Sequence, residues 1–294
     1  MSVEIREPTV DEAAQIVDLL NDHGQASFGE TEIAEAEVRH WFTLPEIWIR
    51  VAEREGRLVG YVDSVPRGKD EATELDVRTL DPESAETLLR AGEERAGTPL
   101  VRVVVQGDDP VLGKVVEASG WRPVRRSYQM RIELDAEPPE PRWPDGISVR
   151  QLQPEDEHRV YEANKVAFAE DWHFRPQPFE RWRDDNFGRE NFDHSLSWLA
   201  EGGEQLAGFS LNSWHFSGDP EFGWVGILGV APDWRRRGLG TALLQQSFRD
   251  FRARGAKRVG LGVDAENVTG AARLYERAGM HVHRLNVTYE KALS

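Results

Sequence analysis

The feature that most constrains the fold is a proline-rich segment with the same order of sequence patterns on either side of it. Residues 136–146 contain four prolines and a Pro-Asp-Gly turn, and proline continues neither a helix nor a central strand because it lacks a backbone N–H. Each flanking half opens with a short alternating strand and a turn into a helix. It continues with a glycine-containing hairpin and ends with a strand, a short helix and a last strand. Three shared patterns in one order indicate an internal duplication. We therefore predict an α/β protein with two tandem domains, residues 1–140 and 147–294, joined by a linker at 136–146.

The composition excludes several classes of protein. A length of 294 residues suits about two domains. With 36 Lys and Arg against 52 Asp and Glu, the formal net charge is −16, which argues against nucleic-acid binding. The chain has no cysteine, so disulfides and thiolate metal sites are excluded, and no His, Asp or Glu spacing suggests another metal site. No apolar run reaches the roughly 18 residues of a membrane helix, and residues 1–7 show no secretory signal pattern. We expect a cytoplasmic monomer or homodimer without a membrane partner.

Basic residues gather in one part of this acidic chain. Residues 1–142 carry 17 basic and 30 acidic side chains, whereas residues 235–258 carry eight basic side chains and a single acidic one, Asp250. Such an island indicates either an anionic ligand or a solvated helix face. We favour the anionic ligand.

A glycine-containing loop is expected between the strand at 222–230 and the helix at 239–254. Free backbone N–H groups at a helix N-terminus bind phosphate oxygens. Gly238 and Gly240 would let a diphosphate approach the backbone closely. Three consecutive arginines, residues 235–237, would add charge-assisted hydrogen bonds. The loop therefore predicts a diphosphate site.

Two motifs carry a resemblance to the GNAT acetyltransferase superfamily. The pattern Arg235-x-x-Gly238-x-Gly240 resembles the pyrophosphate-binding signature of that family, and Arg273-Leu-Tyr-Glu-Arg-Ala-Gly-Met280 resembles its second motif. The specific matches cover about residues 225–290. The resemblance implies two tandem GNAT-like domains, each a mixed central sheet flanked by helices. The nearest architecture is the two-domain actinobacterial type that includes mycothiol synthase.

The resemblance implies acetyl-CoA as donor and direct transfer of the acetyl group to the amine of a small molecule. Tyr275 would protonate the departing thiolate, although a tyrosine in a short helix can also simply pack in the core. Asn267 lies one residue earlier than the asparagine usual in the family, and it either contacts the cofactor or caps the helix. The remaining residues expected to contact acetyl-CoA are Leu228, Gly229, Val230, Arg235, Arg236, Arg237, Gly238, Leu239, Gly240 and Thr241.

The general base stays open at this point. In sequences resembling mycothiol synthase a glutamate begins the strand before the glycine loop, whereas this chain has Trp224 there and Glu221 three residues upstream. We expect Glu221 to be catalytic. The stretch of residues 170–173 is expected to lie at the acceptor pocket, with an exposed acidic turn as the alternative. The other candidate bases are Glu170, Asp171, His173 and His215, and Trp172 lies among them.

The first half lacks the features of a cofactor site. Its counterpart of the glycine loop, residues 76–89, has no glycine, and Asp81, Glu83 and Glu86 would repel a diphosphate. Val116 stands where the second half has Tyr275. We expect a degenerate domain that packs against the second half and walls the acceptor site. Three functions remain as alternatives to small-molecule N-acetylation in general: a reaction like that of mycothiol synthase, acetylation of a protein amine, and acyl-CoA binding without turnover.

Overall fold

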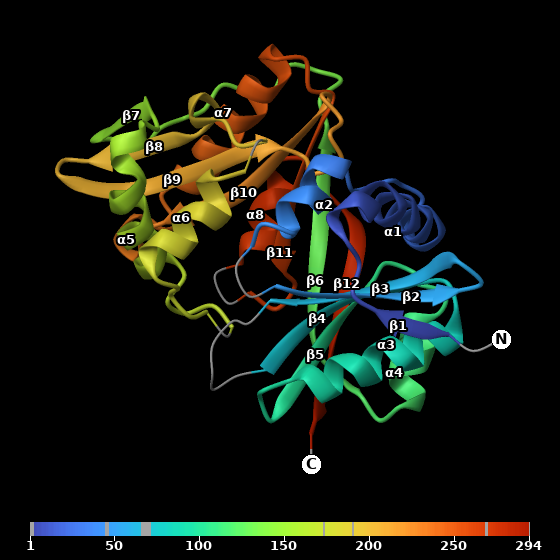
Figure 1. The fold of residues 1–294 in the computed structure, drawn as a ribbon. Coiled ribbons are helices and arrows are strands. Elements are labelled where there is room, and N and C mark those ends of the chain that lie inside the picture. The colour runs from blue at the N-terminus through green and yellow to red at the C-terminus, as the bar shows by residue number, and fades with distance from the viewer. Residues whose placement is uncertain are drawn as a thin grey trace. The chain divides into compact units, whose positions relative to one another are not determined.

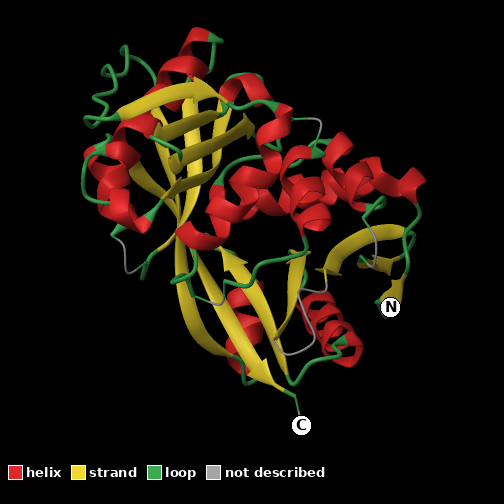
Figure 2. Cartoon of the chain, turned by 90° about the vertical axis from the view of Figure 1, so that its left-hand side faces the viewer, coloured by secondary structure: helices red, strands yellow, loops and turns green. Residues whose placement is uncertain are grey.

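The computed structural model divides into two compact units. It describes residues 3–44, 47–65, 72–172, 174–189, 191–267 and 270–293. The first unit consists of residues 1–127 together with 284–294, and the second of residues 128–283. In both units strands form the centre and helices cover them, as Figures 1 and 2 show.

The first unit is a mixed sheet with the strand order β1-β2-β3-β4-β5-β12. Its neighbouring strands are antiparallel except β4 and β5, which are parallel. The strands are β1 (Glu4–Arg6), β2 (Trp48–Arg54), β3 (Arg57–Val65), β4 (Ala72–Thr79), β5 (Leu100–Gln106) and the later part of β12 (His281–Ala292). The helices are α1 (Ala13–Phe28), α2 (Glu35–Trp41), α3 (Pro82–Arg95) and α4 (Leu112–Ala118), with a 3-10 turn, η1 (Val10–Glu12), before α1.

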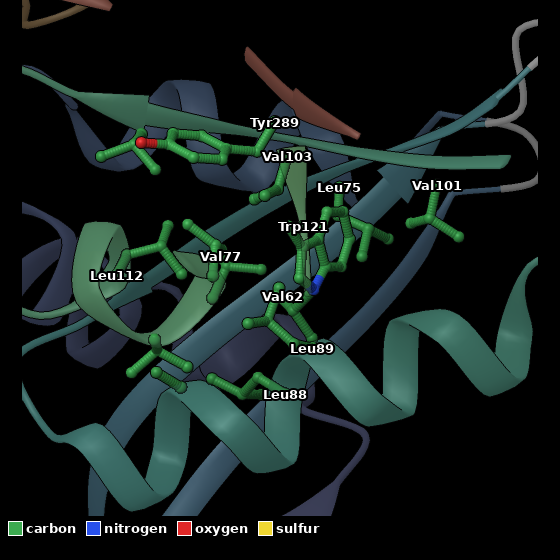
Figure 3. Close-up of a cluster of buried hydrophobic side chains, with 14 of the residues drawn as sticks. Val62, Leu75, Val77, Leu88, Leu89, Val101, Val103, Leu112, Trp121 and Tyr289 are labelled. Carbon is green, nitrogen blue, oxygen red and sulfur yellow. The ribbon is translucent and has the colours of Figure 1, made fainter. Parts of the chain in front are cut away.

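A hydrophobic cluster joins α3 and α4 to this sheet (Figure 3). Leu88 and Leu89 of α3 contact alternate residues of the strands, including Val101 and Val103 of β5, because side chains two apart share one face of a strand. Tyr289 of β12 belongs to the same cluster. The last strand, β12, is therefore part of the core of the first unit. Burying one such side chain contributes about 1.5–3 kcal/mol to stability.

The second unit repeats this plan with the strand order β6-β11-β10-β9-β8-β7. Strands β7 to β10 are antiparallel neighbours, and β10 and β11 are parallel. The strands are the later part of β6 (Arg122–Glu133), β7 (Ile147–Gln151), β8 (Trp198–Gly202), β9 (Gln205–Trp214), β10 (Phe222–Val230) and β11 (Arg258–Asp264). The helices are α5 (Glu157–Ala167), α6 (Phe179–Phe187), α7 (Leu239–Ala253) and α8 (Ala271–Arg277), with 3-10 turns η2 (Pro154–Asp156), η3 (His194–Leu196) and η4 (Pro232–Trp234).

Corresponding details in the two units support the predicted duplication. A capping box begins each first helical segment, at Thr9 in one unit and Gln153 in the other. The hairpins β2–β3 and β8–β9 each carry a register shift, after Ala52 and after Ala200. The predicted fold class, α/β with mixed sheets flanked by helices, is confirmed.

The compact units differ from the two halves of the sequence in their last strands. Asn286 to Ala292 of β12 pair with β5, so the end of the chain groups with the first unit. The later part of β6 neighbours β11 and groups with the second unit. Residues 136–146 form neither helix nor strand. Whether they separate two domains at the predicted bounds, residues 1–140 and 147–294, remains a prediction.

Helix α7 positions the site and is built as its sequence predicts. Leu243, Phe248 and Phe251 are buried on the face that contacts β10 and β11, and the left-handed Gly255, with φ +94°, follows the end of the helix. None of the helices in the described ranges is long and apolar enough to cross a lipid bilayer.

Candidate functional site

A cavity of about 750 Å³ lies in the second unit where β10 and β11 end and α7 and α8 begin. The parallel register of β10 and β11 runs from Phe222 to Trp224, and the later parts of both strands line the cavity. Ligand sites of open α/β sheets form at this carboxyl edge of the strands. The lining residues that the sequence predicted are Glu170, Asp171, Leu228, Gly229, Val230, Arg235, Arg236, Gly238, Leu239, Gly240, Thr241, Asn267 and Tyr275.

The glycine loop needs its two glycines for different reasons. Gly238 precedes α7 with φ +90° and open space beside it, so a side chain is excluded there by backbone conformation rather than by room. A Cβ on Gly240 would lie 3.0 Å from Cδ1 of Leu274, so this glycine allows α7 and α8 to approach each other. Arg236 also has a positive φ, +61°, and such strain gathers at functional sites.

Strand β10 has a bulge and, after it, a close approach at the residues that line the cavity. Its pairing with β9 shifts between Val225 and Ile227, on either side of Gly226. A Cβ on Gly229 would lie 2.5 Å from the Phe209 ring, so this position cannot hold a larger residue without moving that ring. The close packing of Gly229 against Phe209 therefore holds the backbone of Leu228 to Val230 where it lines the cavity.

The three arginines of the loop have different surroundings. The Arg235 guanidinium donates to Glu170 Oε2 at 2.7 Å, to the Ala167 carbonyl at 2.9 Å and to the Val230 carbonyl at 3.4 Å. Arg237 lies over the Trp234 ring at 5.0 Å and is not among the residues lining the cavity. Arg236 and Arg237 form no ion pair within the described ranges. Arg235 thus binds the loop after α5.

Tyr275 lies in α8 with 8% of its surface exposed and lines the cavity. Burial and the nearby Asp171 carboxylate raise the pKa of its phenol to about 12. Its hydroxyl makes no hydrogen bond to another described part of the chain. The ring also packs in the apolar cluster of α7 and α8. Tyr275 is therefore both a core side chain and a cavity side chain.

Two carboxylates and an amide stand near Tyr275. Burial and the Asp264 carboxylate raise the pKa of Asp171. Asn267 Nδ2 donates to Asp171 Oδ1 at 3.4 Å. Sequence analysis missed Asp264, although a polar residue at the carboxyl end of a parallel strand is the signal that could have found it. Gly262 and Arg277 also line the cavity and were missed.

Other predicted residues lie elsewhere. Glu221, just before β10, pairs with Lys257 at 2.6 Å and is not a lining residue. At about 3.3 Å per residue, the nine residues of β10 place it roughly 30 Å from Val230, which lines the cavity. His215 is buried, stacked on Phe222 at 4.1 Å and bonded through Nδ1 to Ser217. Trp172 is 37% exposed and outside the lining. His173 falls outside the described ranges.

The first unit has a different turn at the corresponding position. Only Leu80 and Asp81 separate β4 from α3. Asp81 accepts the backbone N–H of Ser84 at 2.8 Å and pairs with Arg54, and the Arg54 hydrogen bonds lower the Asp81 pKa to about 2. A carboxylate therefore already stands at this helix N-terminus. Val116, the counterpart of Tyr275, is fully buried.

Comparison with known proteins decides the family. Residues 157–280 match the acetyltransferase (GNAT) family. A protein of Stackebrandtia nassauensis named mycothiol acetyltransferase is 32% identical over 266 residues, which cover 85% of this chain and 84% of that protein. The chain belongs to the GNAT acetyltransferase family. It is therefore an acyltransferase, and the family uses acetyl-CoA.

Further relatives support this assignment. A mycothiol acetyltransferase of Geodermatophilus obscurus is 35% identical over 214 residues, covering 70% of this chain and 68% of that protein. A crystal structure of a GCN5-related N-acetyltransferase from Sphaerobacter thermophilus has a TM-score of 0.81 and 30% identity, covering 99% of this chain and 95% of that one. A tandem GNAT protein from the clavulanic acid biosynthesis pathway, 17% identical with a TM-score of 0.79, covers 99% of this chain and 98% of its own, and shows the same fold.

Proposed function

We propose that the second unit binds acetyl-CoA in the 750 Å³ cavity and transfers the acetyl group directly to the amine of a small molecule. The observation that carries this proposal is that the glycine loop and Tyr275 line one cavity. The diphosphate would lie on the N-terminus of α7, beside Gly238 and Gly240. The pantetheine arm would follow β10, where a backbone N–H near the bulge would stabilise the developing oxyanion.

Tyr275 has the properties of the acid in this reaction. When the amine nitrogen bonds to the thioester carbon and the carbon–sulfur bond breaks, the sulfur leaves as a thiolate that takes a proton from the phenol. A phenol pKa of about 12 keeps Tyr275 protonated at neutral pH, so its proton is present when the thiolate leaves. The Asp171 carboxylate contributes to that protonated state.

We assign the base to Asp171 in preference to Glu221. Asp171 lines the cavity with Tyr275, whereas Glu221 is paired with Lys257 at the other end of β10. The raised pKa brings the Asp171 carboxylate nearer to the operating pH, which favours proton transfer. In the proposed step the attacking amine gives its proton to Asp171.

The acceptor is proposed from the relatives. Those named mycothiol acetyltransferase point to a small-molecule amine, and the amine precursor of mycothiol is the first acceptor to test.

One experiment tests the proposed function directly. Purified protein is mixed with acetyl-CoA and a panel of small-molecule amines that includes the mycothiol precursor, and released CoA thiol is measured. We expect amine-dependent thiol release. Binding of acetyl-CoA without release for any amine would favour the non-catalytic module, and acetylation of a peptide amine alone would favour a protein substrate.

A further inference from the structure

The proline-rich linker is fastened along α7 and passes a second cavity. Arg252 donates to the Leu134 carbonyl. Arg249 donates to the Pro138 carbonyl at 2.9 Å and pairs with Glu137 at 3.2 Å. Further along, Trp143 contacts the apolar cluster that holds the start of α7. Residues 139–142 lie between these attachments, so their course beside the helix is set at both ends.

This second cavity adjoins the proposed acetyl-CoA site. It has a volume of about 330 Å³, with linker residues on one side and the first turns of α7 on the other. Gly238 and Thr241 line both cavities, whereas Tyr275 lines only the larger one. The other lining residues are Pro139, Glu140, Arg142, Ala242 and Gln245. The linker cavity thus lies beyond the glycine loop, away from the acid.

The charges around the linker cavity favour an anion. Arg142 is exposed and forms no ion pair or hydrogen bond with any described part of the chain. Arg236 and Arg237, on the adjoining loop, also have no ion pair in those parts. Cations left without carboxylate partners are notable in a chain with a net charge of −16. Glu140 is the one acidic side chain lining the cavity.

We infer that the linker is part of the donor site and that Arg142 binds the 3′-phosphate of the CoA nucleotide. This inference rests on the proposed function. If the thioester lies at Tyr275 and the diphosphate on the glycine loop, the nucleotide extends beyond that loop. The linker cavity is there, and the guanidinium of Arg142 suits a phosphate monoester, for which it forms charge-assisted hydrogen bonds. The segment that joins the two halves of the chain thereby contacts the cofactor.

Calorimetric titration with CoA and with dephospho-CoA tests the inference, because these ligands differ only in the 3′-phosphate. We expect the wild type to prefer CoA. Arg142→Ala should weaken CoA about three- to tenfold, as for an exposed charge pair, and leave dephospho-CoA unchanged. The preference should also shrink at high ionic strength. Glu140→Gln should change it in the opposite direction, since that substitution removes the repelling charge.

Two further variants make the test strict. Arg249→Ala removes one of the attachments of the linker to α7 at a residue that does not line the cavity, and it should reduce the preference for CoA in the same sense. Arg90→Ala, on α3 of the first unit, changes the net charge equally and should have no effect.

Three results would overturn the inference. They are an Arg142→Ala variant that keeps the preference, one that weakens both ligands equally, and a preference abolished instead by Arg277→Ala in the larger cavity. A wild type that binds neither ligand would instead contradict the proposed function.

Discussion

Arg235 and Glu170 form an ion pair of 2.7 Å that ties the glycine loop to the loop after α5. The same guanidinium donates to the carbonyl of Ala167, the last residue of α5, at 2.9 Å, so a second bond holds the start of this second loop. The next residue, Asp171, is the proposed base. An arginine expected from the sequence to bind the diphosphate therefore holds the segment that carries the base.

This arrangement predicts that Arg235 and Glu170 influence kcat through the same contact. Glu170→Gln and Arg235→Ala should each lower kcat through misplacement of Asp171. The double variant should lose little more than one single variant, because both remove the same contact. CoA and a pantetheine fragment without phosphates should weaken by similar factors in Arg235→Ala. A larger loss for CoA, measured by calorimetry, would show that Arg235 binds the diphosphate.

A second prediction concerns the number of cofactor sites. Calorimetry should give one CoA per chain, since Asp81 already occupies the corresponding helix N-terminus of the first unit. Gly238→Asp should abolish binding, because it adds negative charge and a side chain at φ +90°. Gly255→Asp makes the same change at φ +94° after the other end of α7 and should still bind CoA. Two sites of similar affinity would contradict the proposed loss in the first half.

Local sequence predicts this site only in part. The glycine loop, α7 and Tyr275 are predictable because each depends on residues close together in the chain. The partner of Arg235 is not, because Glu170 lies 65 residues away and meets it only after the sheet has formed. The grouping of β12 with the first unit is equally hidden, since its alternating pattern would suit either sheet.

A third prediction separates chemistry from packing at Tyr275. Tyr275→Phe keeps the ring, so we expect the thermal midpoint and CoA affinity to change little. The kcat should fall about 10²–10⁴-fold, or roughly 3–5 kcal/mol in barrier, as for loss of a positioned acid. Tyr289→Phe is the matched control, because this tyrosine is also 8% exposed and its hydroxyl donates to Glu117 at 3.0 Å in the first unit. Near-normal turnover of Tyr275→Phe would remove the phenol from the mechanism.

The last prediction is that the charged Asp171 carboxylate is needed for activity but lowers the stability of the folded protein. Its pKa is raised by burial and by Asp264, so the folded protein binds this proton more tightly than the unfolded chain does. The charged form therefore costs stability above the folded pKa, and that cost disappears as the pH falls below the ordinary aspartate value near 3.8.

Asp171→Asn removes the charge. It should raise the thermal midpoint at neutral pH, and the difference from the wild type should vanish at acid pH. The same variant should lose most of its turnover, and in the wild type kcat/KM should fall as the pH drops through the raised pKa because the base becomes protonated. Thermal scans and rates measured across one pH series test both. If turnover were kept in Asp171→Asn while the midpoint rose, Asp171 would be a buried charge without a part in the reaction.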